Sequence, residues 1–215
     1  MTKYLDESAL FKILDRAYER ALSSAPLPGI DSSLTLANKY LNRKGTLAEK
    51  VEALITWQNT KAATIGFFTG FGGITALPVT IPSNLASVLY IQIRMVAAIA
   101  IMGGYDLKNA KVKTMIFTCL CGNVATDVLK SYGIQLSTKL TQQVLLTLEE
   151  KILTKIQTTI AGKIIGRVSE SGLLSTTKAV PFLGGIVSGT FDAFTTNAIG
   201  KVAKMVFIND KKNDA

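Results

Sequence analysis

A stretch of 32 residues without a charge, residues 62–93, constrains this chain more than any other feature of its sequence. Glycines and prolines interrupt it. So much apolar surface has to leave water, either inside a helical core or in a bilayer. The mean hydropathy of +0.31 is high for a soluble protein and low for a polytopic membrane protein. Composition alone therefore leaves both destinations open.

Residues 62–81 and 85–102 each have the length of a membrane span, so a two-span hairpin is one interpretation. Threonines, glycines and prolines dilute the first segment. The second carries Arg94 near its middle, where insertion into a bilayer costs about 2.5–3.5 kcal/mol. No basic cluster flanks the connecting turn. We therefore expect a bent hairpin in the core of a helical bundle, with membrane contact as a function that it serves.

Apolar residues elsewhere recur at spacings of three and four, and no strand pattern of convincing length occurs. The fold class predicted is all-α: a bundle of about seven or eight helices with a central apolar helical hairpin. Residues 1–59 are expected to be amphipathic helices that pack on the core, residues 60–207 the main helical domain, and residues 208–215 a charged tail.

Two helix starts can be placed from capping residues. Thr46 and Glu49 form a capping box, in which each side chain can satisfy a free amide of the other residue. Asp106 is expected to cap the next helix after the central one, and this helix is expected to continue to about Tyr132.

The formal net charge is +9, and the surplus lies in the second half of the chain. Residues 1–107 hold 10 Lys and Arg against 8 Asp and Glu, whereas residues 108–215 hold 14 against 7. A basic half suits an anionic membrane surface or an acidic partner, and a plain solvated surface is the alternative. Nucleic acid is not expected, because aromatic residues are not interleaved with the lysines. The candidate binding residues in this half are Lys151, Lys155, Lys163 and Arg167.

Three charges stand alone in apolar surroundings, namely Arg94, Asp127 and Asp192. A buried charge needs a partner, so we expect Arg94 to pair with one of the two aspartates inside the bundle. The alternative is that all three are partly exposed. These three residues, with Asn84 and Asp106, complete the set of candidate binding residues.

No constellation for catalysis is present in the sequence. The chain has no histidine, which removes histidine bases and histidine metal ligands, and it has no Walker loop. Cys119 and Cys121 point to nearly opposite sides of a helix, so neither a disulfide nor a shared metal is expected. No cofactor is predicted. Two thiols and an N-terminus without an apolar signal core favour a cytoplasmic location.

Several short motifs, built mostly from glycine, proline and aliphatic residues, follow one another in a specific order. They are Gly70–Pro78, Ile81–Leu85, Ile93-Arg94, Ile99-Ala100, Gly104–Leu107, Val180–Gly189 and Phe191-Asp192. In this order the chain resembles the EcsC protein family, bacterial proteins named for a gene adjoining an ABC transporter. The resemblance covers about residues 60–207. One departure is Asn84, since the family usually has an aspartate ten residues before the arginine.

The resemblance implies a helical fold and an association with membranes or transport. With the charge asymmetry, it leads to the hypothesis of a non-enzymatic protein at the cytoplasmic membrane face. The partner expected there is an anionic lipid surface or a membrane protein. A second hypothesis is a soluble module that binds a hydrophobic ligand in a cavity between helices. A third, less favoured, is an enzyme with an Asp/Lys site; a Ser–Lys arrangement also stays open.

Overall fold

The protein is described by a computed structural model over residues 7–23, 30–63, 83–134, 149–170 and 184–208. Side chains are described in these ranges except at 61–63, 83–88, 167–170 and 184–195. Within the described ranges the chain forms eight α-helices and one short 3-10 helix, and no strand. The all-α prediction is confirmed.

The helices and their bounds follow the chain in order. They are α1 (Glu7–Leu22), α2 (Ser33–Leu41), α3 (Leu47–Ala63), α4 (Ser83–Met102), α5 (Ala110–Cys119), the 3-10 helix η3 (Gly122–Val124), α6 (Ala125–Ser131), α8 (Glu150–Glu170) and α9 (Gly184–Phe207).

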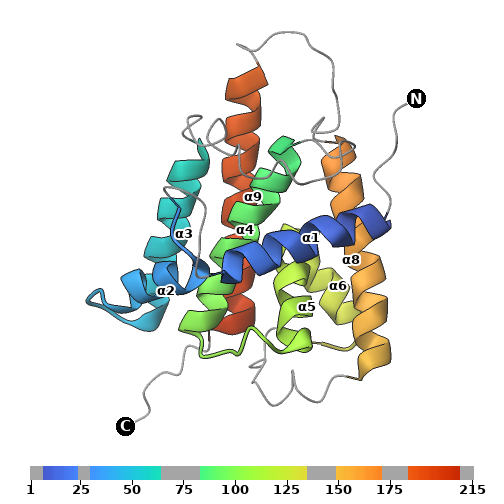
Figure 1. The fold of residues 1–215 in the computed structure, drawn as a ribbon, viewed down its shortest axis with the longest axis horizontal. Helices are drawn as coiled ribbons and strands as arrows, with labels where there is room; N and C mark the ends of the chain where they lie inside the picture. The colour runs from blue at the N-terminus through green and yellow to red at the C-terminus, as the bar shows by residue number, and fades with distance from the viewer. Residues whose placement is uncertain (1–6, 24–29, 64–82, 135–148, 171–183, 209–215) are drawn as a thin grey trace.

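Helices α4 and α9 lie side by side at the centre, α3 packs against α9 on one side of them, and α1 crosses in front of α4 (Figure 1). Lys204 near the end of α9 pairs with Glu52 near the start of α3, so these two helices are antiparallel. Gly103, just after α4, lies against the main chain of Phe207 at the end of α9. Helices α4 and α9 therefore run in the same direction.

Helix α4 is the most deeply buried element. Every residue from Leu89 to Ala100 is buried, which explains why this part of the chain is apolar on all sides. No helix in the described ranges is both long and apolar enough to cross a bilayer. For residues 89–93 of the uncharged stretch, the expected place in the protein core is confirmed. Residues 64–82 of the same stretch lie outside the described residues.

The capping box at the start of α3 is confirmed. The Thr46 amide donates to Glu49 Oε2 at 2.7 Å, and the Glu49 amide donates to Thr46 Oγ1 at 3.3 Å. These bonds hold the pKa of the Glu49 carboxyl below its usual value. Local sequence rules therefore decide where α3 begins.

The single helix expected from Asp106 to Tyr132 is wrong. Asn109 caps α5 by accepting a hydrogen bond from the Lys111 amide, while Asp106 accepts from the Lys108 amide in the preceding turn. The helix then ends at Cys119, and η3 and α6 follow. Gly122 has a φ of +59°, which a continuous α-helix does not allow.

Candidate functional site

Arg94 lies inside the bundle, with 2% of its surface exposed. Its guanidinium donates to the main-chain oxygen of Asp31 at 2.9 Å and to Gln58 Oε1 at 3.0 Å. It thereby connects α4 to α3 and to the residues just before α2. The prediction that this cation is buried and bonded is confirmed.

The expected ion pair between Arg94 and Asp127 is wrong. Asp127 is exposed on α6, whereas the acceptors of Arg94 are the Asp31 carbonyl and an amide oxygen. Neither acceptor atom carries a formal charge. Asp192 belongs to α9, but its side chain lies outside the described residues, so that pair stays a prediction.

Burial lowers the pKa of the Arg94 guanidinium, and Tyr90 and Asp31 act in the opposite direction. Arginine nevertheless stays protonated in proteins. In the described part of the chain, Arg94 Nε, Gln92 Oε1 and Asn59 Oδ1 have no hydrogen-bond partner. Arg94 therefore anchors three elements of the core and is closed off from the surface. We infer that it serves the fold and does not contact a ligand on the surface.

Two of the other isolated candidates, Asp106 and Asp127, are exposed and lie apart from buried Arg94. Asp106 is exposed in the turn before α5. Asn84 lies in the first turn of α4, and its side chain is outside the described residues. The three candidates whose side chains are described, Arg94, Asp106 and Asp127, therefore do not make one site.

Three of the four basic candidates lie together on the outward side of α8. Lys151, Lys155 and Lys163 are all exposed. We call these residues the lysine face. Arg167 follows one turn after Lys163 in the same helix, and its side chain lies outside the described residues.

The opposite side of α8 holds it against the bundle. Its buried residues recur at spacings of three and four, as an amphipathic helix requires; they are Leu153, Ile156, Ile160, Ala161 and Ile164. Polar bonds fix its position: Gln157 Nε2 donates to Thr114 Oγ1 of α5 at 3.2 Å, and the Tyr132 hydroxyl is 2.7 Å from Thr159 Oγ1.

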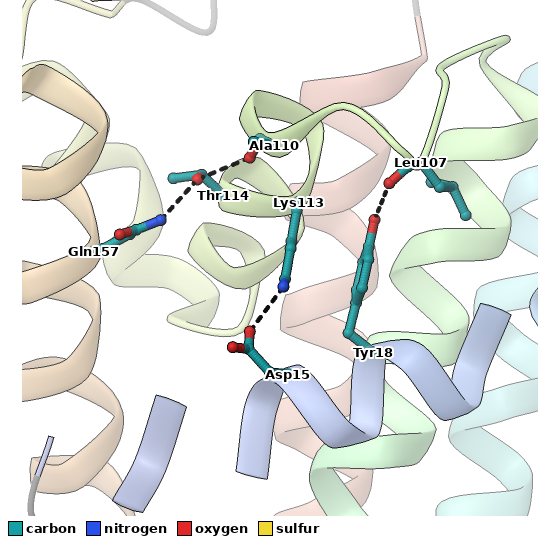
Figure 2. Close-up of polar contacts among 7 residues, drawn as sticks. All are labelled: Asp15, Tyr18, Leu107, Ala110, Lys113, Thr114 and Gln157. Carbon is teal, nitrogen blue, oxygen red and sulfur yellow. Dashed lines mark hydrogen bonds and ion pairs between the residues drawn. The ribbon is translucent and has the colours of Figure 1, made fainter. Parts of the chain in front are cut away.

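Figure 2 shows how this support continues into α1 through α5. Lys113 of α5 forms an ion pair of 2.9 Å with Asp15 of α1. The Tyr18 hydroxyl donates to the Leu107 carbonyl at 2.6 Å. Burial is the main cause that raises the pKa of Tyr18, and the negative charge of Asp106 also raises it. Helix α8, which carries the lysine face, is thus connected by polar contacts to α5 and, through α5, to α1.

Among the described residues, no ion pair neutralises the charge of the lysine face. Lys151 and Lys155 are four residues apart, and so are Lys163 and Arg167. Like charges at this spacing repel each other by a few tenths of a kcal/mol. None of the three lysines forms an ion pair with a described residue, and no acidic residue occurs between Lys151 and Arg167. Glu149 and Glu150 are exposed at the start of α8.

The exposed residues between these lysines have small side chains and are only weakly polar. Thr154 and Thr158 turn their hydroxyls back to main-chain oxygens one turn earlier. A Cβ atom added to Gly162 or Gly166 would meet nothing within 4 Å. A flat anionic surface could therefore approach the ammonium groups without displacing bulky side chains.

Groups suited to nucleophilic or metal chemistry do not gather in the described ranges. Cys119 and Cys121 are both buried, and burial raises the pKa of the Cys119 thiol. A thiol held in its protonated form is a poor nucleophile. No cluster of three or more acidic or cysteine side chains there could hold a metal ion.

A comparison with protein-family models matches residues 32–208 to the EcsC protein family. The chain belongs to the EcsC protein family. The EcsC match begins well before residue 60, where the recognisable motifs start, and so includes α2 and α3. It also contains Arg94 and its contact Gln58, while Asp31, whose carbonyl Arg94 also contacts, immediately precedes the first matched residue. No curated protein and no solved structure gave a significant match to this EcsC chain.

Proposed function

We propose that this protein is a non-enzymatic helical protein that works at the cytoplasmic face of a membrane. The lysine face of α8 binds the anionic headgroups of lipids there. The observation that carries this proposal is the row of exposed lysines, Lys151, Lys155 and Lys163, without an ion-pair partner among the described residues. Each basic residue close to an anionic lipid surface contributes about 1 kcal/mol to binding.

Two further features of the sequence favour a membrane surface, rather than an acidic protein in solution, as the partner of the lysine face. The charge surplus lies in the second half of the chain, which contains α8. The segment 64–82, which connects α3 to α4, has no charged residue and is rich in apolar ones. Electrostatic attraction combined with apolar contact is the usual basis of peripheral membrane binding.

Vesicle flotation tests the proposal. The unmodified protein is expected to float with vesicles that contain anionic phospholipid at low salt, and to be released as salt rises. Changing Lys151, Lys155 and Lys163 together to glutamate is expected to weaken this partitioning at least about a hundredfold, since roughly 1 kcal/mol is lost for each lysine.

A matched variant separates a specific face from net charge. Three exposed lysines lie elsewhere: Lys12 on α1, Lys39 on α2 and Lys44 after α2. Changing these three to glutamate alters the net charge by the same amount as changing the lysine face. This variant should keep most of the binding. If both triple variants bind equally well, or if the unmodified protein does not float at low salt, the proposal is wrong.

A further inference from the structure

The outward side of α3 forms a groove with the end of α2, on the side of the molecule away from α8 (Figure 1). Its volume is about 520 Å³, within the range of binding sites for small molecules or single side chains. We call this the α3 groove. Its lining residues are Tyr40, Arg43, Glu49, Glu52, Ala53, Thr56, Trp57 and Thr60.

Trp57 is the only tryptophan in the chain, and 48% of its surface is exposed. Small side chains, Ala53, Thr56 and Thr60, lie around it in the groove. A half-exposed tryptophan beside small residues is typical of a protein-binding surface, where its large ring supplies contact area at low entropic cost.

Two carboxylates lie on the same side of α3 as Trp57. Glu49 Oε2 accepts the Thr46 amide of the capping box, and Glu52 Oε2 accepts from Lys204 at 3.2 Å. In both residues the second oxygen, Oε1, has no hydrogen bond to the described part of the chain. Because a carboxylate has about four lone-pair sites, each group can still accept bonds from a partner.

The cations near the α3 groove already have contacts within the protein. Arg43 lies over the Tyr40 ring, with its guanidinium carbon 4.0 Å from the ring centroid. Lys204 is held by Glu52. The groove therefore combines a half-exposed indole with two carboxylate oxygens that have no hydrogen bond to the described part of the chain. Its chemistry is complementary to lysine and arginine side chains, which stack on indole rings and bond to carboxylates.

We propose that the α3 groove binds a short basic segment of a partner protein, rich in lysine and arginine. The groove lies across the molecule from the lysine face, so it stays accessible when that face contacts a membrane (Figure 1). The inference therefore goes beyond the proposed function and does not depend on it. The aliphatic part of a basic side chain packs on Trp57, and its charged end bonds to Oε1 of Glu49 or Glu52.

Trp57 fluorescence tests this inference without any membrane. The probe is a short peptide with blocked ends, in which arginines and lysines are spaced by alanine and glycine and aromatic residues are absent. Its addition is expected to change the Trp57 emission in a saturable manner that weakens with salt. Changing Glu49 and Glu52 together to glutamine is expected to reduce the affinity at least about tenfold.

Two controls make the peptide test specific. Glu7 and Glu19 are exposed on α1, and changing both to glutamine should leave the affinity unchanged. A peptide with glutamate in place of each basic residue should not bind. Circular dichroism checks that the groove variant keeps its helices. The inference is overturned if the emission does not respond, or if the groove variant binds as tightly as the unmodified protein.

The outcomes also separate this inference from the proposed function. If the basic peptide fails to bind while the protein still floats with anionic vesicles, the inference alone is wrong. If flotation fails, the membrane-face function is wrong whatever the peptide does. Self-association of the protein that changes Trp57 emission, and that the basic peptide cannot reverse, would assign the α3 groove to a second copy and overturn the inference.

Discussion

Changing Arg94 to alanine is expected to lower the free energy of unfolding by roughly 3–5 kcal/mol. The change removes a side chain that is 2% exposed and leaves the Asp31 carbonyl and Gln58 Oε1 without their donor. Burying polar atoms without partners, together with a cavity, is among the costliest effects of a single substitution. Denaturant unfolding followed by circular dichroism measures the loss.

Two further variants show whether the bonds of Arg94 carry this effect. Lysine at position 94 keeps the charge but cannot donate to both acceptors as the planar guanidinium does, so we expect it to recover only part of the loss. Lys12 is exposed on α1, and its change to alanine should cost no more than about 0.5 kcal/mol. Unfolding of the alanine variant at the denaturant midpoint of the unmodified protein would contradict the anchoring role.

The second large effect is expected where α4 ends against α9. A Cβ atom added to Gly103 would overlap the main-chain oxygen of Phe207 and lie 3.1 Å from its carbonyl carbon. These are backbone atoms and cannot rotate away, so alanine at this position has to separate the two helix ends. We expect a loss of roughly 1–3 kcal/mol in stability, or about 2–4 °C in Tm for each kcal/mol.

Gly162 is the matched control for Gly103, and its change to alanine should have the opposite sign. It lies exposed in α8, and an added Cβ meets nothing within 4 Å. Alanine there is expected to raise stability by roughly 0.5–1 kcal/mol, because glycine is a poor helix former. Equal losses in both variants, measured by thermal unfolding, would show that the contact with Phe207 does not determine the effect.

Local signals in the sequence predict much of this fold because they depend on neighbouring residues. The capping box of Thr46 and Glu49 sets the start of α3, and the spacing of apolar residues by three and four predicts the amphipathic helix α1. The break after Cys119 is different. Apolar residues continue through it, and only the φ of Gly122 reveals the turn.

The partners of Arg94 show where sequence reasoning fails for the site. Isolation of a charge predicts burial, but the search for opposite charges led to Asp127, which is exposed, and to Asp192, whose side chain lies outside the described residues. The main-chain oxygen of Asp31 has no side-chain signature at all. Gln58 does have one: it follows Val51, Leu54 and Ile55 on the inward side of α3, where a polar residue needs a buried partner.

The lysine face could be predicted in part, since the charge surplus of the second half pointed to Lys151, Lys155 and Lys163. Their common exposure on one side of α8 required the structure. The α3 groove was not found from the sequence, because Trp57 and Glu52 resemble ordinary exposed residues of an amphipathic helix. Their significance depends on the hollow they share with Tyr40 and Arg43.

A fluorophore on the lysine face tests the membrane-face account most directly. Both native cysteines are buried, so a single new cysteine can be labelled selectively with an environment-sensitive nitrobenzoxadiazole dye. Thr158 lies exposed on the lysine side of α8, and Thr56 lies exposed on α3, across the molecule (Figure 1). With vesicles that contain anionic lipid, the dye on Thr158→Cys should gain intensity and shift to the blue, while the dye on Thr56→Cys should not change. No response at position 158, or an equal response at both positions, would contradict the account.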